Sequence, residues 1–170
     1  MPSNLFYLAY GSNLHPQRLA VRIPSCTFVA TTVLTGYALR FHKRGGDGSG
    51  KCDALRTRNT GDELPGAVFR MAAADKPLLD EIEGAGYRVD IQVVVVAGEE
   101  VQAFMYVAEA DYIEAQLQPF QWYKELVYHG ARFHDFHPQH LDLIHRTPAI
   151  EDVDPERHSR NQRILALMCS

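Results

Sequence analysis

The sequence predicts an α+β fold: a mainly antiparallel, barrel-like β-sheet with helices packed around it. In the first two thirds of the chain, short apolar and β-branched segments follow one another at hairpin spacing. In the last third, apolar residues recur at the spacing of amphipathic helices. Strands that precede helices favour this class over a doubly wound sheet, in which the two alternate. The 170 residues fit one domain spanning 1–170, with a core at about 5–146 and a polar tail at 147–170.

The chain is expected to begin with a buried strand at residues 5–10, an apolar and aromatic run that stops at Gly11. Asn13 closes the following turn and can cap a helix at about 16–23, because proline is accepted in a first helical turn. The sequence therefore predicts a strand, a tight turn and a helix in direct succession.

Two further strands are expected at residues 27–34 and 38–42, which are rich in β-branched and aromatic residues. The dipeptide Thr35-Gly36 between them suggests that they pair with each other. Residues 44–53 contain four glycines and few apolar residues. This composition predicts a mobile loop or lid.

The middle of the chain alternates apolar segments with turn residues, which predicts more strands. These are 54–58 and 66–71, with a turn at 59–62, and a hairpin of 87–96 with 101–107, joined at 97–100. Residues 73–83 form a short predicted helix that ends at Gly84. The last third adds predicted helices at 121–133 and 138–146, and a short one at 160–168.

The composition is that of a soluble globular protein. The net charge is −4 and charged residues make up 22% of the chain, so no basic surface predicts nucleic-acid binding. The N-terminus does not resemble a signal peptide, and the longest apolar run, 93–97, is too short to cross a bilayer. The three cysteines are widely spaced, which favours neither a disulfide framework nor a zinc site. We therefore expect a cytoplasmic protein without a membrane or nucleic-acid partner.

Glu83 is the first candidate for acid–base chemistry, because it ends the short helix next to an apolar stripe. Leu78, Leu79 and Ile82 form that stripe, and Glu83 follows Leu79 by one turn. Asp80 should point well away from it. The helix dipole and desolvation should both raise the pKa of Glu83, which suits proton exchange near neutral pH. The alternative is a surface glutamate in an acidic run.

The loop from Tyr10 to Leu14 is the second candidate, as a binding element. A strand that ends in Gly11-Ser12-Asn13 and opens a helix presents free backbone N–H groups, which suit an anionic or carbonyl oxygen. An ordinary strand-to-helix turn with an asparagine cap would give the same pattern, so the loop alone does not decide between a binding element and an ordinary turn.

Other groups carry weaker signals. His134, His137 and His140 have a spacing that zinc sites use, but Pro138 interrupts them and no further ligand is apparent, so solvated histidines are favoured. Cys52 has no local support as a nucleophile. The aromatic cluster Phe120, Trp122, Tyr123 and Tyr128 is expected in the core, with one tyrosine hydroxyl able to reach a pocket.

Three segments, in order from about residue 5 to residue 144, resemble the γ-glutamylcyclotransferase-like family, which includes AIG2-like and γ-glutamylamine cyclotransferase proteins. Tyr7-Leu8-Ala9-Tyr10-Gly11-Ser12-Asn13-Leu14 is similar to the N-terminal signature of that family. Leu79-Asp80-Glu81-Ile82-Glu83-Gly84, followed by Gly86-Tyr87, is similar to its catalytic-glutamate segment. The C-terminal helical segment of the family is resembled by three pieces of this chain: Tyr123-Lys124-Glu125, His129-Gly130-Ala131 and Pro138-Gln139-His140-Leu141.

The resemblance implies the γ-glutamylcyclotransferase-like fold and an enzyme that needs neither cofactor nor metal. Its small-molecule substrate is a γ-glutamyl amine or amino acid, whose α-amine attacks its own γ-carbonyl to give 5-oxoproline and the free amine. Glu83 is the implied catalytic acid/base. The implied substrate-binding residues are Tyr7, Ala9, Tyr10, Gly11, Ser12, Asn13, Leu14, Tyr87 and Tyr123. Whether the protein forms a homodimer is left open.

Alternatives remain at this point. The same residues would serve a γ-glutamyl acyltransferase, a cyclotransferase acting on a specialised metabolite, or a binding module without turnover. Residues 44–53 match no pattern of the family, and the sequence after Ile144 lies outside the resemblance. The identity of the released group is therefore undetermined.

Overall fold

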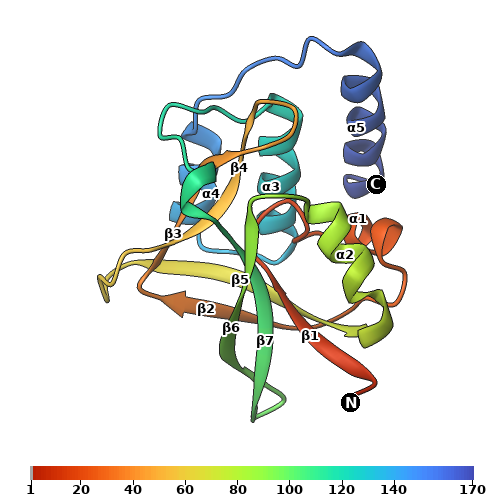
Figure 1. The fold of residues 1–170 in the computed structure, drawn as a ribbon, viewed down its shortest axis with the longest axis vertical. Coiled ribbons are helices and arrows are strands. Elements are labelled where there is room, and N and C mark those ends of the chain that lie inside the picture. Colours follow the sequence, from red (N-terminus) through yellow and green to blue (C-terminus); the bar gives the residue numbers. More distant parts are fainter. Residues whose placement is uncertain (1) are drawn as a thin grey trace.

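The computed structural model describes residues 2–170. It has a five-stranded sheet, a separate two-stranded sheet and five α-helices (Figure 1). The strands are β1 (Asn4–Ala9), β2 (Thr27–Thr35), β3 (Tyr37–Arg44), β4 (Gly50–Arg56), β5 (Glu63–Ala72), β6 (Tyr87–Val96) and β7 (Glu99–Ala108). The α-helices are α1 (Pro16–Arg22), α2 (Lys76–Glu83), α3 (Gln121–Phe133), α4 (Pro138–Arg146) and α5 (Pro155–Met168). Short 3₁₀ turns lie at Ala73–Asp75 and Ala110–Tyr112.

The large sheet is built around β1, in the order β2-β5-β1-β7-β6. β1 pairs antiparallel with β5 from Asn4↔Ala72 to Ala9↔Ala67, and parallel with β7. Its central position explains the apolar run, because Leu8 and Ala9 are buried between neighbours on both sides. The expected α+β class with a mainly antiparallel, curled sheet is confirmed.

The predicted pairing of the second and third strands is wrong. β2 pairs with β5 in the large sheet, whereas β3 pairs with β4 in the small one. Gly36 alone separates β2 from β3, and a hairpin turn needs two residues or more. Gly36 instead donates its N–H to Asp62 O at 2.8 Å and accepts the N–H of Thr57 at 2.8 Å, so the chain passes from one sheet into the other.

The loop predicted at 44–53 is shorter than expected. Residues from Gly50 onward belong to β4, which leaves a five-residue turn at 45–49. Asp47 organises this turn: it accepts the Ser49 N–H at 2.9 Å and forms an ion pair with Lys51 at 2.7 Å. The glycines between β3 and β4 give this part of the sequence the composition of a loop, which is why the first residues of β4 were not predicted as a strand.

The β6–β7 hairpin is also tighter than predicted. Its turn consists of Ala97 (φ 53°) and Gly98 (φ 83°), and the two following glutamates lie in β7. Positive φ at both turn positions matches the twist of the flanking strands.

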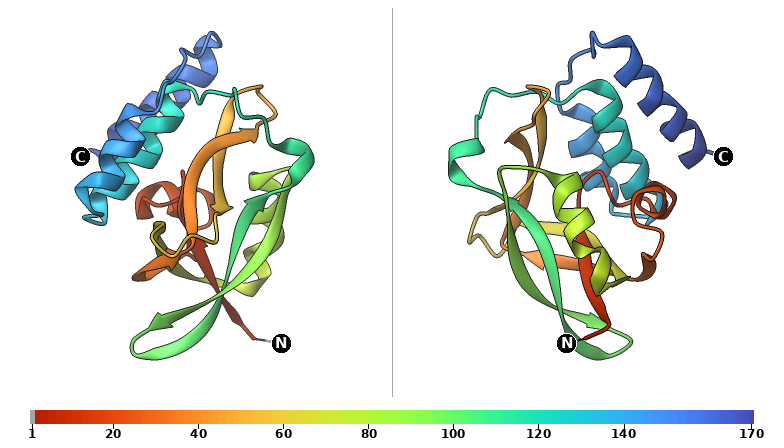
Figure 2. Two further views of the ribbon diagram at one scale, coloured as in Figure 1. Left: turned by 90° about the vertical axis from the view of Figure 1, so that its left-hand side faces the viewer. Right: turned by 45° about the vertical axis from the view of Figure 1, so that its right-hand side comes forward.

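The helices gather mainly on one side of the sheets. Figure 2 shows α3, α4 and α5 side by side there, while α2 lies against a different face of the strands. α3 and α4 have the predicted bounds. α5 begins earlier than expected, at Pro155, because Asp154 caps it by accepting the N–H groups of Glu156 and Arg157. Leu165 and Met168 then join the core. Within residues 2–170 no helix is long and apolar enough to cross a membrane.

Gly130 sets the distance between α3 and the loop after β1. A Cβ at this position would lie 2.6 Å from Leu14 Cβ and 3.1 Å from His15 N. We predict that Gly130→Ala lowers the free energy of unfolding by about 1–2 kcal/mol, because overpacking against backbone exceeds the gain in helix propensity.

Urea denaturation measures this change. Gly46→Ala is the matched control, since no heavy atom lies within 4 Å of a Cβ there. Equal stability of Gly130→Ala and the native protein would contradict the close packing of α3 on Leu14.

Candidate active site

Helix α2 places Glu83 at the edge of the core. Leu79 is fully buried and Ile82 is half-buried, whereas Leu78 is 45% exposed, so the expected apolar stripe is narrower than predicted. Asp80 is exposed and accepts hydrogen bonds from Lys76 Nζ and the Tyr106 hydroxyl, both at 2.6 Å. Glu83 is half-buried and is the last residue of the helix.

Asn13 holds the Glu83 carboxyl group. Its Nδ2 donates to Glu83 Oε1 at 2.7 Å and to the Tyr7 hydroxyl at 3.2 Å. Arg22 Nη1 in turn donates to Asn13 Oδ1 at 3.2 Å. The asparagine is buried, and its amide joins strand β1, helix α1 and helix α2 in one hydrogen-bonded chain.

The environment of Glu83 changes its acidity. Burial raises the pKa of its carboxyl group above the ordinary value. Arg22, the hydrogen bond from Asn13, Arg18 and Lys43 act in the opposite direction, but they do not cancel the effect of burial. The raised pKa therefore has desolvation as its main cause, and the protonated form of Glu83 is easier to reach than that of an exposed glutamate.

A small cavity of about 30 Å³ lies beside this carboxyl group. Its lining contains seven of the nine predicted binding residues together with Glu83: Tyr7, Tyr10, Gly11, Ser12, Asn13, Tyr87 and Tyr123. Cys52 and Tyr106 complete the wall. Ala9 and Leu14 are buried in the core and line neither this cavity nor the larger pocket next to it.

The tyrosines around the cavity are held by backbone groups of the strands β4 and β7. Tyr87 donates its hydroxyl proton to Cys52 O at 2.6 Å, and the Tyr123 hydroxyl accepts the Cys52 N–H at 3.0 Å. The Tyr10 hydroxyl donates to Tyr106 O. Burial raises the pKa of Tyr10, Tyr87 and Tyr123 well above the usual value, so their hydroxyls stay neutral. Tyr123, and not Tyr128, is thus the tyrosine of the aromatic cluster that lines the cavity.

The loop between β1 and α1 keeps its backbone donors available. The N–H groups of Gly11, Ser12 and Asn13 have no hydrogen-bond partner within residues 2–170, whereas the next one, Leu14 N–H, returns to Gly11 O at 3.3 Å. Ser12 lines both the cavity and the larger pocket. The loop therefore has the free donors that the sequence predicted.

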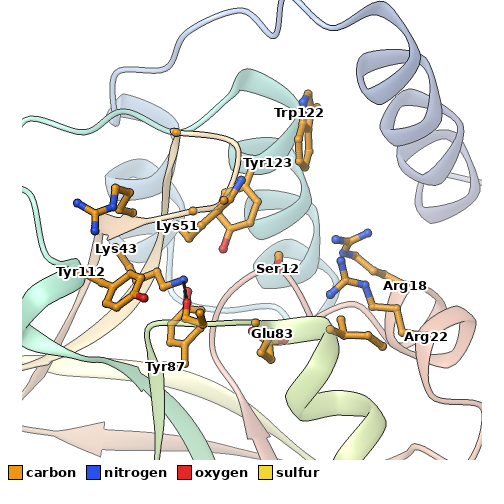
Figure 3. Close-up of a pocket in the computed structure, with 17 residues that line it drawn as sticks. Ser12, Arg18, Arg22, Lys43, Lys51, Glu83, Tyr87, Tyr112, Trp122 and Tyr123 are labelled. Atoms are coloured by element: carbon orange, nitrogen blue, oxygen red, sulfur yellow. Dashed lines mark hydrogen bonds between the residues drawn. The ribbon is translucent and has the colours of Figure 1, made fainter.

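A larger pocket of about 650 Å³ opens next to Glu83 and carries five cationic side chains that sequence reasoning missed: Arg18, Arg22, Lys43, Arg44 and Lys51. Figure 3 shows Arg18 and Arg22 on one side of Glu83, and Lys43 and Lys51 on the other. Arg18 and Arg22 lie one turn apart on α1. This spacing puts both side chains on one face of the helix, so the sequence alone could have indicated that they act together. The two lysines come from β3 and β4, whose proximity depends on tertiary structure.

The lysines are fixed by their neighbours. Lys43 Nζ donates to Ala85 O at 2.7 Å and lies 4.3 Å from the centroid of the Tyr87 ring. Lys51 pairs with Asp47 and lies 4.7 Å from the centroid of the Tyr123 ring. Burial lowers the pKa of both lysines. The pocket is therefore cationic, with Glu83 between its two positive sides.

The histidines of the H-x-x-H-x-x-H pattern lie at a separate pocket of about 470 Å³. His134 hydrogen-bonds to Leu14 O at 2.7 Å, and His137 caps α4 by accepting the Gln139 N–H at 3.2 Å. Burial lowers the pKa of His140 to about 4. His134 and His140 are thus half-buried rather than solvated. Among residues 2–170, no group of three histidine, cysteine or acidic side chains is arranged to hold a metal ion.

Taken together, the site combines a carboxyl group of raised pKa, free backbone donors, neutral hydroxyls and a cationic rim. Such an arrangement can orient a small anionic molecule and exchange protons with it. The geometry defines a small-molecule enzyme pocket.

Comparison with known proteins assigns this chain to a family. The model of the family "γ-glutamyl cyclotransferase, AIG2-like" matches residues 7–125. Human γ-glutamylcyclotransferase is 32% identical over 140 residues, which cover 76% of this chain and 71% of the human protein. The mouse γ-glutamylcyclotransferase is 33% identical over 133 residues, which cover 74% of this chain and 69% of the mouse protein. The chain therefore belongs to the γ-glutamyl cyclotransferase, AIG2-like family and is an enzyme of the γ-glutamylcyclotransferase class.

Solved structures show the same fold. One γ-glutamyl cyclotransferase structure aligns with a TM-score of 0.78 at 23% identity and covers 94% of this chain and 99% of its own. The structure of an uncharacterized human protein also aligns with a TM-score of 0.78, at 24% identity, and covers 95% of this chain and 99% of its own. The expectation of a γ-glutamylcyclotransferase-like fold is confirmed.

The raised pKa of Glu83 has a consequence for stability. A carboxyl group whose pKa is raised on folding stabilises the protein in its protonated form, and that contribution is lost as the pH rises from about 4.3 through the raised pKa. We predict that Glu83→Gln, which does not titrate, has a higher midpoint of thermal unfolding than the native protein above this pH range. The difference should shrink toward zero as the pH falls to about 4.

Scanning calorimetry across this range measures both proteins. Glu81→Gln is the control, because Glu81 is exposed on the same helix. If Glu83→Gln were the less stable protein at neutral pH, the carboxylate would be stabilised rather than destabilised by its surroundings.

Proposed function

We propose that this enzyme converts a γ-glutamyl amine or amino acid into 5-oxoproline and the free amine, with Glu83 as the catalytic acid and base. The observation that carries the proposal is the Glu83 carboxyl group, which has a raised pKa, accepts a hydrogen bond from Asn13 and lines both the small cavity and the larger pocket. Membership of the γ-glutamylcyclotransferase class supplies the reaction type.

The reaction is an internal acyl transfer. The α-amino nitrogen of the γ-glutamyl unit attacks the γ-carbonyl carbon, a C–N bond closes the five-membered ring, and the original amide C–N bond breaks. The nitrogen that attacks loses a proton and the nitrogen that leaves gains one. Glu83 takes the first proton and delivers the second, so it returns to its starting state. A carboxyl group of raised pKa is better matched to both transfers than an ordinary glutamate.

Binding in a folded conformation provides the rest of the rate enhancement. The reacting amine and carbonyl belong to one molecule, and holding them close together gives a high effective molarity. The free N–H groups of Gly11, Ser12 and Asn13 are suited to the oxygens of the γ-glutamyl unit and to the charge that develops on the γ-carbonyl oxygen. Tyr87 and Tyr123 form the wall that closes the site.

The role of Glu83 is tested with Glu83→Gln, which keeps the shape of the side chain but cannot accept the proton. We expect 5-oxoproline release to fall by about 10²–10⁴-fold. Chromatographic detection of 5-oxoproline over a panel of γ-glutamyl amines and amino acids measures the loss. Glu81→Gln, two residues away on the exposed side of α2, should keep full activity.

Each other result has a definite meaning. Full activity of Glu83→Gln would remove Glu83 from the mechanism. Transfer of the γ-glutamyl group to an added amine, without ring closure, would identify an acyltransferase instead. Thermal stabilisation of the native protein by the panel compounds without any product, even at high protein concentration, would indicate a binding module.

A further inference from the structure

A second cationic cavity adjoins the active-site pocket on the side of helices α1 and α5. Its volume is about 320 Å³, and it shares Arg18, Arg22 and Trp122 with the larger pocket. Arg157 and Arg160 of α5 complete its charged lining. Glu83 and the loop after β1 lie outside it, so the order of compartments runs from the small cavity, through the main pocket, to this α1–α5 cavity.

Arg18 occupies the boundary between the main pocket and the α1–α5 cavity. The residue is only 4% exposed, and its Nε has no hydrogen-bond partner within residues 2–170. Burial and the neighbouring Arg22 lower the pKa of its guanidinium group to about 9. A buried cation without a partner is costly, and a bound anion removes that cost. Figure 3 shows its guanidinium group beside that of Arg22, on the side of Glu83 opposite Lys43.

The lining of the α1–α5 cavity contains four arginines and no acidic residue. One of them, Arg157, is already paired with Asp152 at 2.6 Å, which also accepts the indole N–H of Trp122 at 2.8 Å. Arg18 is the most deeply buried of the remaining cations. Val21 and Ile164 add apolar contact next to the Trp122 ring. Arginine forks beside apolar walls match a carboxylate at the end of a peptide.

We infer that the α1–α5 cavity is a subsite for a carboxylate at the far end of the released part of the substrate, with Arg18 as the specificity-determining residue. This inference rests on the proposed function. The γ-glutamyl unit lies against Glu83, the released part crosses the main pocket, and its terminal carboxylate reaches Arg18. The main pocket, at about 650 Å³, is large enough for more than the γ-glutamyl unit, so it has room for a released part that ends in a carboxylate, such as an amino acid or a short peptide.

A matched pair of substrates tests the inference on the native enzyme. γ-Glutamyl-alanylglycine and its C-terminal carboxamide differ only in the terminal charge. We expect the acid to be converted with a kcat/KM about ten- to a hundredfold higher than the amide, as one charged hydrogen-bonded pair would give. Most of the difference should lie in KM, because the carboxylate is remote from the reacting atoms.

Variants then assign the preference to this cavity. Arg18→Gln should lose about ten- to a hundredfold in kcat/KM on the acid and little on the amide, a selectivity that general damage to the fold would not produce. Arg160→Gln, at the exposed side of the cavity, should show a smaller loss of the same kind. Arg163→Gln is the control, since this exposed arginine of α5 lines neither cavity.

Equal kcat/KM of the native enzyme on the acid and the amide would overturn the subsite while leaving the proposed reaction intact. An acid preference that survives in both Arg18→Gln and Arg160→Gln would also overturn it. Failure of the proposed function looks different: neither substrate, nor any member of the wider γ-glutamyl panel, would yield 5-oxoproline.

Discussion

The hydrogen bond from Asn13 to Glu83 is the interaction on which the site depends. It connects the turn after β1 to the end of α2, two segments separated by 70 residues. A carboxyl group at this partly buried position is poorly solvated, and its pKa is raised for that reason. The amide of Asn13 moderates the effect and fixes the direction of the carboxyl group. The hydrogen bond therefore fixes the position of Glu83 and moderates the rise in pKa that burial causes.

The cationic rim follows from the same arrangement. Helix α1 starts directly after the loop, so Arg22 reaches back to Asn13 and Arg18 faces the pocket. On the other side, Lys43 is held by Ala85 O just beyond α2. Positive groups on both sides of Glu83 attract a molecule with more than one anionic group toward this carboxyl group.

Local patterns in the sequence predicted most elements, because strand and helix periodicity depends on neighbouring residues. The bounds of α3 and α4 were predicted correctly, and Glu83 lies beside the loop at Gly11–Asn13 as expected. The partners of the strands were harder to predict than the strands themselves. The single residue between β2 and β3 excludes a hairpin, but it does not reveal that β2 pairs with β5 and β3 with β4. Lys43 was missed for a related reason, since an alternating strand pattern does not show which cavity a side chain faces.

The pH dependence of kcat/KM, compared between the native enzyme and Asn13→Ala, tests the central role of Glu83 most directly. Because kcat/KM reports ionisations of the free enzyme, the acidic limb should have a midpoint above the ordinary glutamate pKa of about 4.3. Asn13 lowers the pKa of Glu83 by its hydrogen bond, so the midpoint should move further upward in Asn13→Ala. An acidic limb at or below the ordinary value, or a midpoint that is unchanged by Asn13→Ala, would assign the proton transfer to another group.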